Sequence, residues 1–305
     1  MSAPEKAAAT KPADKTAAKE GVILDRGYQP YRGRYLPQSG HWAVIARQML
    51  KTTARQPWVI VMLVLAALPT VVCGVVLYIA TKMAGIEGAK DVMQPDRIVM
   101  LPWGTTTLAF FLALFAGGGQ VADDARAGAF QFYFSRPVSR DQYLIGKLVP
   151  VIFLTAVASL MPALLLSLLR LALLPTSGDI VHHLPLVGAT LLVGIIEALA
   201  LAVPAVAASS LSKRRGYVQG LFATLYLLPW LVGRIFVGVT RSPWPALPSV
   251  PAHLENVAHA LYRIPWASDE PALPVWVSLA FLGALIGGSF WLLRRRLASV
   301  EVVAS

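Results

Sequence analysis

Charged residues and cysteine are scarce in this chain of 305 residues. Only 14% of the residues are charged, whereas soluble globular proteins carry about a quarter. The hydrophobic share of 56% and a mean hydropathy of +0.60 favour a protein embedded in lipid. A single cysteine cannot form an internal disulfide, so Cys73, in an apolar segment, is expected to be a free core thiol. These shortages argue against a soluble enzyme, a disordered regulator and a disulfide scaffold.

The short motifs of nucleotide and metal chemistry are also absent from the sequence. It contains no Gly-x-x-x-x-Gly-Lys-Ser/Thr loop, no His-Glu-x-x-His pair, no Gly-x-Ser-x-Gly elbow and no cysteine cluster. We therefore expect no catalytic residues, no cofactor and no ATP hydrolysis on this chain alone. The loop histidines compose a weak candidate metal site, although histidines in loops are more often solvated: His182, His183, His253 and His259, with Glu255 between the last two.

Long apolar segments are abundant. A bilayer core about 30 Å thick needs roughly 20 mainly apolar helical residues. Six segments meet this length: about 57–80, 99–119, 144–174, 184–210, 217–239 and 273–293. The sequence therefore predicts an all-α polytopic membrane protein, with a single transmembrane domain of six helices over 57–296. The third segment contains Pro150 and Pro162 and is long enough to tilt or kink.

The distribution of basic residues predicts the orientation. The net charge of +11 could suggest nucleic acid, but on a membrane chain Lys and Arg hold cytoplasmic loops inside. Segments 1–56, 120–147, 213–215 and 294–296 carry 20 Lys and Arg, against 5 in the alternate connections. With an even number of spans, this asymmetry places both termini in the cytoplasm. It explains the charge without a nucleic-acid partner.

The segments outside the spans differ in character. Residues 1–40 are rich in Ala and Lys and are expected to form a disordered basic tail, and 297–305 a short cytoplasmic tail. Residues 41–56 place Trp42, Ile45 and Met49 near one helical face and basic residues on another. This pattern predicts an amphipathic helix at the cytoplasmic membrane surface, in contact with lipid. A simple basic flank of the first span is the alternative.

The first cytoplasmic loop, about 120–143, holds the most informative pattern. Aromatic residues over 130–134 are framed by charges, and Pro137 ends any helix before Ser139 opens the next. Aromatic side chains anchor in a partner's groove, and charges set the register of docking. The loop is therefore interpreted as a docking surface. An aromatic belt beside the membrane is the alternative.

Residues 117–150 resemble the permeases of the ABC-2 class of ABC transporters. The family pattern places an acidic residue before a glycine, then Ser-Arg-Pro-Val-Ser-Arg and Gly-Lys. Here Asp124, Gly128, 135–140 and 146–147 match it in register. The sequence departs from the family at 129–131, where Ala-Phe-Gln replaces the usual Thr, Leu and Glu. Six spans and cytoplasmic termini also fit this family.

The resemblance implies a half-transporter. Two permease chains pair, here expected as a homodimer, and each receives a separate ATP-binding subunit that carries ATP and Mg. The chain would then be an exporter in the bacterial inner membrane. A short helix of the loop would seat in a groove of the ATPase, with Phe130 and Phe134 as its buried anchor. The resemblance and the loop pattern together mark nine coupling residues: Asp123, Asp124, Arg126, Gly128, Phe130, Phe134, Arg136, Pro137 and Arg140.

Glu197, near the middle of the fourth span, requires an explanation because an ionised carboxylate there costs several kcal/mol. Arg234 and Arg170 are its candidate partners. A structural ion pair, a protonated carboxyl bonded to a hydroxyl, and a substrate contact all remain open. Glu197 also supports an alternative function, an ATP-independent secondary carrier. A membrane-embedded enzyme is a third hypothesis, but no nucleophile and base pair is recognisable.

Glycines in the last span predict close packing of helices, and prolines in the fourth and fifth spans predict kinks. Gly283, Gly287 and Gly288 in the last span would allow close approach of another helix. Pro204 and Pro229 permit kinks in the fourth and fifth spans. The long fifth connection, 240–272, is rich in proline and is expected to hold at most a short helix around 252–263.

Overall fold

The computed structural model describes residues 40–83, 106–135, 138–174, 177–266 and 271–299. The chain divides into two units, Met1–Leu36 and Pro37–Ser305, and all described residues belong to the second. The basic tail expected before residue 40 and the end of the C-terminal tail, from 300, lie outside these ranges. So do 99–105, where the second span was expected to begin, and the coupling candidates Arg136 and Pro137.

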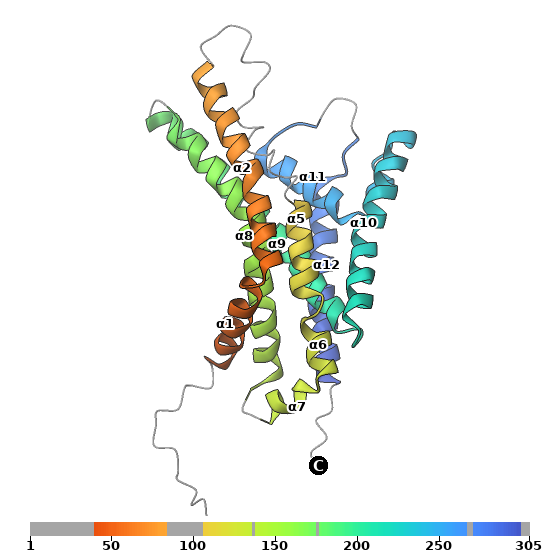
Figure 1. Cartoon of the computed structure of the whole chain (residues 1–305). Helices are drawn as coiled ribbons and strands as arrows, with labels where there is room; N and C mark the ends of the chain where they lie inside the picture. The colour runs from red at the N-terminus through yellow and green to blue at the C-terminus, as the bar shows by residue number, and fades with distance from the viewer. Residues whose placement is uncertain (1–39, 84–105, 136–137, 175–176, 267–270, 300–305) are drawn as a thin grey trace, which may run out of the picture. The chain divides into compact units, whose positions relative to one another are not determined.

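The described part of the chain is helical, without a strand. Its elements in order are α1 (His41–Ala54), α2 (Pro57–Met83), α5 (Thr106–Gly117), α6 (Gln120–Arg126), α7 (Ala129–Phe134), α8 (Arg140–Ala172), α9 (Ser177–Ser209), α10 (Arg215–Thr240), the 3-10 turn η3 (Trp244–Ala246), α11 (Val250–Tyr262) and α12 (Val275–Ala298) (Figure 1). Among these residues, six helical segments are long and apolar enough to cross a membrane. They confirm the predicted all-α class with six spans.

The observed spans differ from the predicted ones mainly at their ends. The second runs over Thr106–Arg126 and joins α5 to α6, and the last continues to Ala298. The third begins at Arg140, because the Ser139 hydroxyl accepts a hydrogen bond from the backbone N–H of Gln142 and the Gln142 side chain accepts one from Ser139 N–H. This capping box satisfies two free donors of the first turn. Pro150 and Pro162 lie inside α8 without ending it.

The long helices α8 and α9 form the centre of the bundle, and every other span packs against one or both of them. At Gly194 of α9 an added Cβ would lie 2.7 Å from the Leu160 side chain and 3.1 Å from Leu160 Cα. The absence of a Cβ therefore lets α9 pack closely on α8. The predicted close approach at Gly283, Gly287 and Gly288 is not found among the described residues, since none of their atoms lies within 4 Å of an added Cβ there.

The outer spans expose apolar side chains. The most apolar windows of α2, α10 and α12 are only 17%, 17% and 11% buried. On α12 the exposed Trp276 lies at the start of the helix and the exposed Trp291 lies 15 residues later, about 22 Å along the axis at 1.5 Å per residue. Tryptophans concentrate at the two membrane–water interfaces. The spacing therefore suits a helix that crosses the bilayer.

The predicted amphipathic helix is present as α1. Its buried residues are Ala46, Met49 and Thr53, and it packs on α8, where an added Cβ at Gly146 would lie 2.9 Å from Ile45. Arg47 is exposed on the other side. The helix and its two faces follow the sequence prediction, while contact with lipid remains a prediction.

Candidate functional site

The candidate docking segment is built from two short helices, α6 and α7, which lie near one end of the bundle in Figure 1. We call residues 120–135 the elbow. Gly128 lies between the two helices with φ of 66°, in the left-handed region. Most side chains pay a steric cost in that conformation and glycine does not. Gly128 therefore permits the sharp change of direction that turns α7 away from α6.

The base of the elbow is held by a nearly buried ion pair. Lys147 Nζ of α8 lies 2.8 Å from Asp124 Oδ2, and the two side chains are only 9% and 17% exposed. Tyr143, one turn earlier on α8, donates its hydroxyl to the same oxygen at 2.6 Å. The ammonium also lies 5.6 Å from the ring centre of Tyr143 and 5.9 Å from that of Tyr133. The charges are thus compensated by each other, a hydrogen bond and two aromatic faces.

The elbow is also joined to α9 and α10. The backbone N–H of Val121 donates to Ser209 Oγ at the end of α9, at 3.1 Å. Arg215, the first residue of α10, lies 3.6 Å from Asp123 and donates to the carbonyl of Phe115 at 3.0 Å. Arg126 pairs with Asp123 at 2.8 Å but is 65% exposed. Such exposed pairs contribute at most about 1 kcal/mol, so their role is to set geometry.

The start of α8 is connected to the end of α12. Arg140 Nη1 donates to the carbonyl of Ala298 at 2.7 Å, and Arg294 Nε lies 3.4 Å from Asp141. The elbow and the segment that follows it therefore contact the ends of four spans: α8, α9, α10 and α12. Arg140 thus acts within this chain, in addition to any contact with a partner.

The aromatic residues of α7 pack mostly against Tyr143. Phe130 and Phe134 stack on each other with ring centres 6.0 Å apart, and both meet Tyr143 edge-on, at 5.7 and 6.0 Å. Burial, together with the nearby Asp124 carboxylate, raises the pKa of Tyr133 above its usual range. Phe132 points elsewhere and is 74% exposed. The two rings expected to anchor in a partner are thus engaged inside the chain, whereas Phe132 is the free aromatic group of α7.

The sequence interpretation missed Tyr143, Lys147 and Arg215 as parts of this site. The sequence did indicate Lys147, because it lies near the start of an apolar span and is the second residue of the matched Gly-Lys pair. A lysine is almost never buried unless it is paired. Of the nine expected coupling residues, the structure groups Asp124 with Phe130 and Phe134 around Tyr143, and it places Asp123 with Arg126.

Glu197 lies in the bundle interior and is only 3% exposed. The Thr106 side chain lies close to its carboxyl, yet neither Thr106 Oγ1 nor Glu197 Oε1 has a hydrogen-bond partner among the described residues. Arg234, an expected partner, pairs instead with Glu255 at 4.0 Å. Arg170 lies in the last turn of α8. The proposed pair of Arg234 with Glu197 is therefore wrong.

The four histidines predicted to lie in loops are in helices instead: His182 and His183 in α9, and His253 and His259 in α11. His253 is fully buried; its Nε2 lies 2.7 Å from the carbonyl of Leu247 and its Nδ1 lies 3.0 Å from Ser278 Oγ. Asn256 donates to Ser278 Oγ at 2.9 Å and to the carbonyl of Leu273 at 2.8 Å. Burial lowers the pKa of His253, with an opposing contribution from the Leu247 carbonyl. In the described ranges no three His, Cys, Asp or Glu side chains group as metal ligands.

The described residues thus form a polytopic helical bundle with an elbow that is braced by contacts within the chain. The family profile of ABC-2 family transporter proteins matches residues 42–261, which extend from α1 to the end of α11. Since the match covers most of the chain, the protein belongs to the ABC-2 family of transporter proteins. It is a membrane transport subunit with several spans. No protein with a curated description matches the chain.

Proposed function

We propose that this chain is the permease subunit of an ATP-driven ABC-2 exporter and that its elbow receives a separate ATP-binding subunit. The observation that carries the proposal is the contrast within α7. Phe130 and Phe134 fix the helix on Tyr143, while Phe132 stands 74% exposed. A large aromatic side chain on a rigid support is typical of an anchor for a partner's pocket.

The contacts at the base of the elbow would transmit a movement of the partner to the spans. ATP-driven closure of two ATPase subunits would displace the elbow, and a loosely held loop would absorb that movement. Asp124 connects the elbow to α8 and Asp123 connects it to α10, while Val121 connects it to α9. A displacement of the elbow would therefore reach three spans together. Rigid-body rearrangement of packed helices is an established route between alternate states.

The remaining parts of the proposal follow from charge and from the family. The basic end that carries the elbow faces the cytoplasm, as the positive-inside rule predicts. A second copy of the chain completes the pathway as a homodimer in the bacterial inner membrane, among membrane lipids. ATP and Mg would bind the partner subunit. Membership of the family supports the ATP-binding partner, and the exposed faces of α2, α10 and α12 offer area for lipid or a second copy.

The test is recovery of the partner with a tagged chain from its native membrane, followed by mass spectrometry and an ATPase assay. Phe132→Ala is expected to lose the ATP-binding subunit and the ATPase activity without loss of the folded permease. Phe153→Ala is the matched control, because Phe153 is similarly exposed, at 52%, but lies within α8. Equal recovery of an ATPase by both variants, or no ATPase with the wild-type chain, would overturn the proposal.

A secondary carrier remains the alternative, and Glu197 is the observation that favours it. A buried carboxyl without a partner for Oε1 could take up and release a coupling proton. This mechanism predicts ion-gradient-driven transport that is independent of ATP and abolished by Glu197→Gln. Retained ATP-dependent transport in Glu197→Gln vesicles would exclude it.

A further inference from the structure

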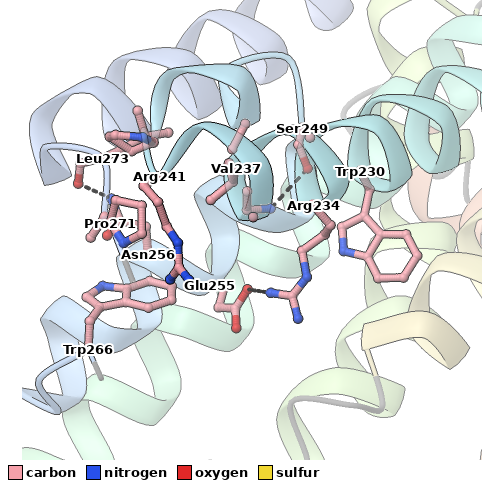
Figure 2. A pocket seen from close by; sticks show the side chains of 16 residues that line it. Trp230, Arg234, Val237, Arg241, Ser249, Glu255, Asn256, Trp266, Pro271 and Leu273 are labelled. Carbon is pink, nitrogen blue, oxygen red and sulfur yellow. Dashed lines mark hydrogen bonds and ion pairs between the residues drawn. The ribbon is translucent and has the colours of Figure 1, made fainter. Parts of the chain in front are cut away.

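A cavity lies at the end of α10 that is far from the elbow. This helix begins at Arg215 beside the elbow and has 26 residues, so its far end lies about 39 Å away. There, α10, η3, α11 and residues 271–273 enclose a cavity of about 360 Å³ (Figure 2). This volume lies within the range of small-molecule sites.

Two arginines line the cavity. Arg234 lies within α10, and Arg241 is the residue that caps the C-terminal end of this helix. In Figure 2 the Arg234 side chain reaches toward Glu255, and the Arg241 side chain lies beside Trp266. Glu255 lies 4.0 Å from Arg234, a long contact, and Arg241 has no ion pair among the described residues. The described lining therefore holds two guanidinium groups and one carboxylate, which gives it a net positive charge.

The backbone at Arg241 is held in an unfavourable conformation. Arg241 ends α10 with φ of 52° and ψ of 26°, in the left-handed region where glycine or asparagine is usual. Among the described residues only Arg241 and Arg263 are non-glycine residues with positive φ. Such strain persists where the surrounding structure imposes it, and it concentrates at ligand sites. Arg241 therefore occupies a backbone conformation that disfavours an arginine.

Rigid aromatic walls complete the cavity. Trp266 stacks on His259, with ring centres 4.0 Å apart and an angle of 13°. Trp230 lies on α10 and is 39% exposed. Asn256 binds the carbonyl of Leu273 and so fixes the opposite wall. Because contacts within the chain already hold these side chains in place, they lose little conformational entropy when a ligand binds.

An apolar track runs beside the cavity. Leu231, Ile235 and Val239 recur every four residues on α10 and are 53%, 57% and 76% exposed. The row is exposed among the described residues and spans the same part of α10 as Arg234. A ligand with its charged group in the cavity would place an acyl chain along the row. The arrangement thus combines two arginines in a cavity with an exposed apolar row on the same helix end.

We propose that this cavity binds the phosphate headgroup of an anionic amphiphile, with Arg241 and Arg234 as its ligands. Guanidinium groups match phosphate oxygens through paired N–H donors. The tryptophans flank the headgroup, and the row on α10 receives the acyl chain. The site is separate from the elbow, and its occupancy requires neither ATP nor the partner subunit, so its failure is distinguishable from failure of the proposed function.

The experiment is native mass spectrometry of the purified full chain, released from a neutral detergent. The probes are dioleoyl phosphatidic acid, dioleoyl phosphatidylcholine with the same chains, and inorganic phosphate with none. We expect phosphatidic acid to bind at least tenfold more tightly than either other probe. Equal binding of the two lipids would overturn the anionic preference, and equal binding of inorganic phosphate would overturn the amphiphile.

A matched pair of variants tests the residues. Arg241→Asn removes the charge and introduces a residue that tolerates the left-handed region, so the fold should keep or gain thermal stability. Binding of phosphatidic acid should fall about tenfold or more, as for loss of a charged hydrogen bond. Arg263→Asn makes the same change at the end of α11, outside this cavity, and should bind as the wild type does. Equal affinity in the two variants would overturn the assignment.

Glu255→Gln provides a test of opposite sign. It removes the carboxylate that competes for Arg234, so binding of phosphatidic acid should tighten severalfold. A purely structural role for Glu255 would give unchanged or weaker binding, and that result would contradict the competition that the site requires.

Discussion

Lys147 Nζ of α8 lies 2.8 Å from Oδ2 of Asp124 on α6, although 23 positions separate the two residues in the sequence. Tyr143 donates to the same oxygen. This three-residue contact converts a short loop between two spans into a braced element. In the proposed function, this contact would give the elbow a rigid surface for a nucleotide-binding partner.

Breaking this contact on one side should be costly. Lys147→Met leaves the Asp124 carboxylate poorly exposed and without its cation, and removal of one partner of a buried pair costs roughly 3 kcal/mol or more. We expect a clear loss of thermal stability in detergent. The double variant Asp124→Asn with Lys147→Met removes both charges and should recover part of that loss. An additive double variant would show that the pair does not brace the elbow.

The two kinds of phenylalanine in α7 should separate stability from partner binding. Phe130→Ala removes a half-buried ring from the stack on Tyr143 and should cost about 1–3 kcal/mol, below the range for a fully buried phenylalanine. Phe132→Ala should change the free energy of unfolding by no more than about 0.5 kcal/mol, as for an exposed site, and should abolish partner recovery. Thermal unfolding of both variants in one detergent is the measurement, and a stability loss in Phe132→Ala equal to that in Phe130→Ala would contradict the assignment.

The close packing of α8 and α9 predicts a strong position effect for glycine. Gly194→Ala places a Cβ 2.7 Å from the Leu160 side chain, and overpacking of this kind costs typically 1–3 kcal/mol. Gly188→Ala is the control on the same helix, because no atom lies within 4 Å of its added Cβ. That change should be neutral or stabilising by up to about 1 kcal/mol. Similar unfolding temperatures for the two variants would contradict the close approach.

His253 should make stability depend on pH. Burial lowers its pKa in the folded protein, so the unfolded chain, with a histidine pKa of about 6.5, takes up the proton first as the pH falls. The stability that neutral His253 contributes is therefore present above about pH 6.5 and is lost below it. The unfolding temperature should fall between pH 7.5 and 5.5, and less steeply in His253→Gln. Equal slopes in the two proteins would assign the effect to another group.

The sequence by itself determined the secondary structure to a large extent. Span length follows from bilayer thickness and hydropathy, which is why six spans were predictable, although the second ends at Arg126 rather than 119 and the last at Ala298 rather than 293. The start of α8 followed from Pro137 and Ser139, since a capping serine is a local signal. The faces of α1 followed from helical periodicity. Each of these features depends on residues that are neighbours along the chain.

The tertiary structure alone decided which side chains meet. Arg234 faces Glu255 rather than Glu197, and Phe130 and Phe134 pack on Tyr143 rather than toward a partner. Close approach occurs at Gly194 and not at the glycines of α12. Hydropathy predicts that a helix is apolar, but it does not predict which face of the helix packs against a neighbouring helix. That choice depends on the rotation and register of packed helices, because a contact between side chains of different spans is determined by all the packing around it.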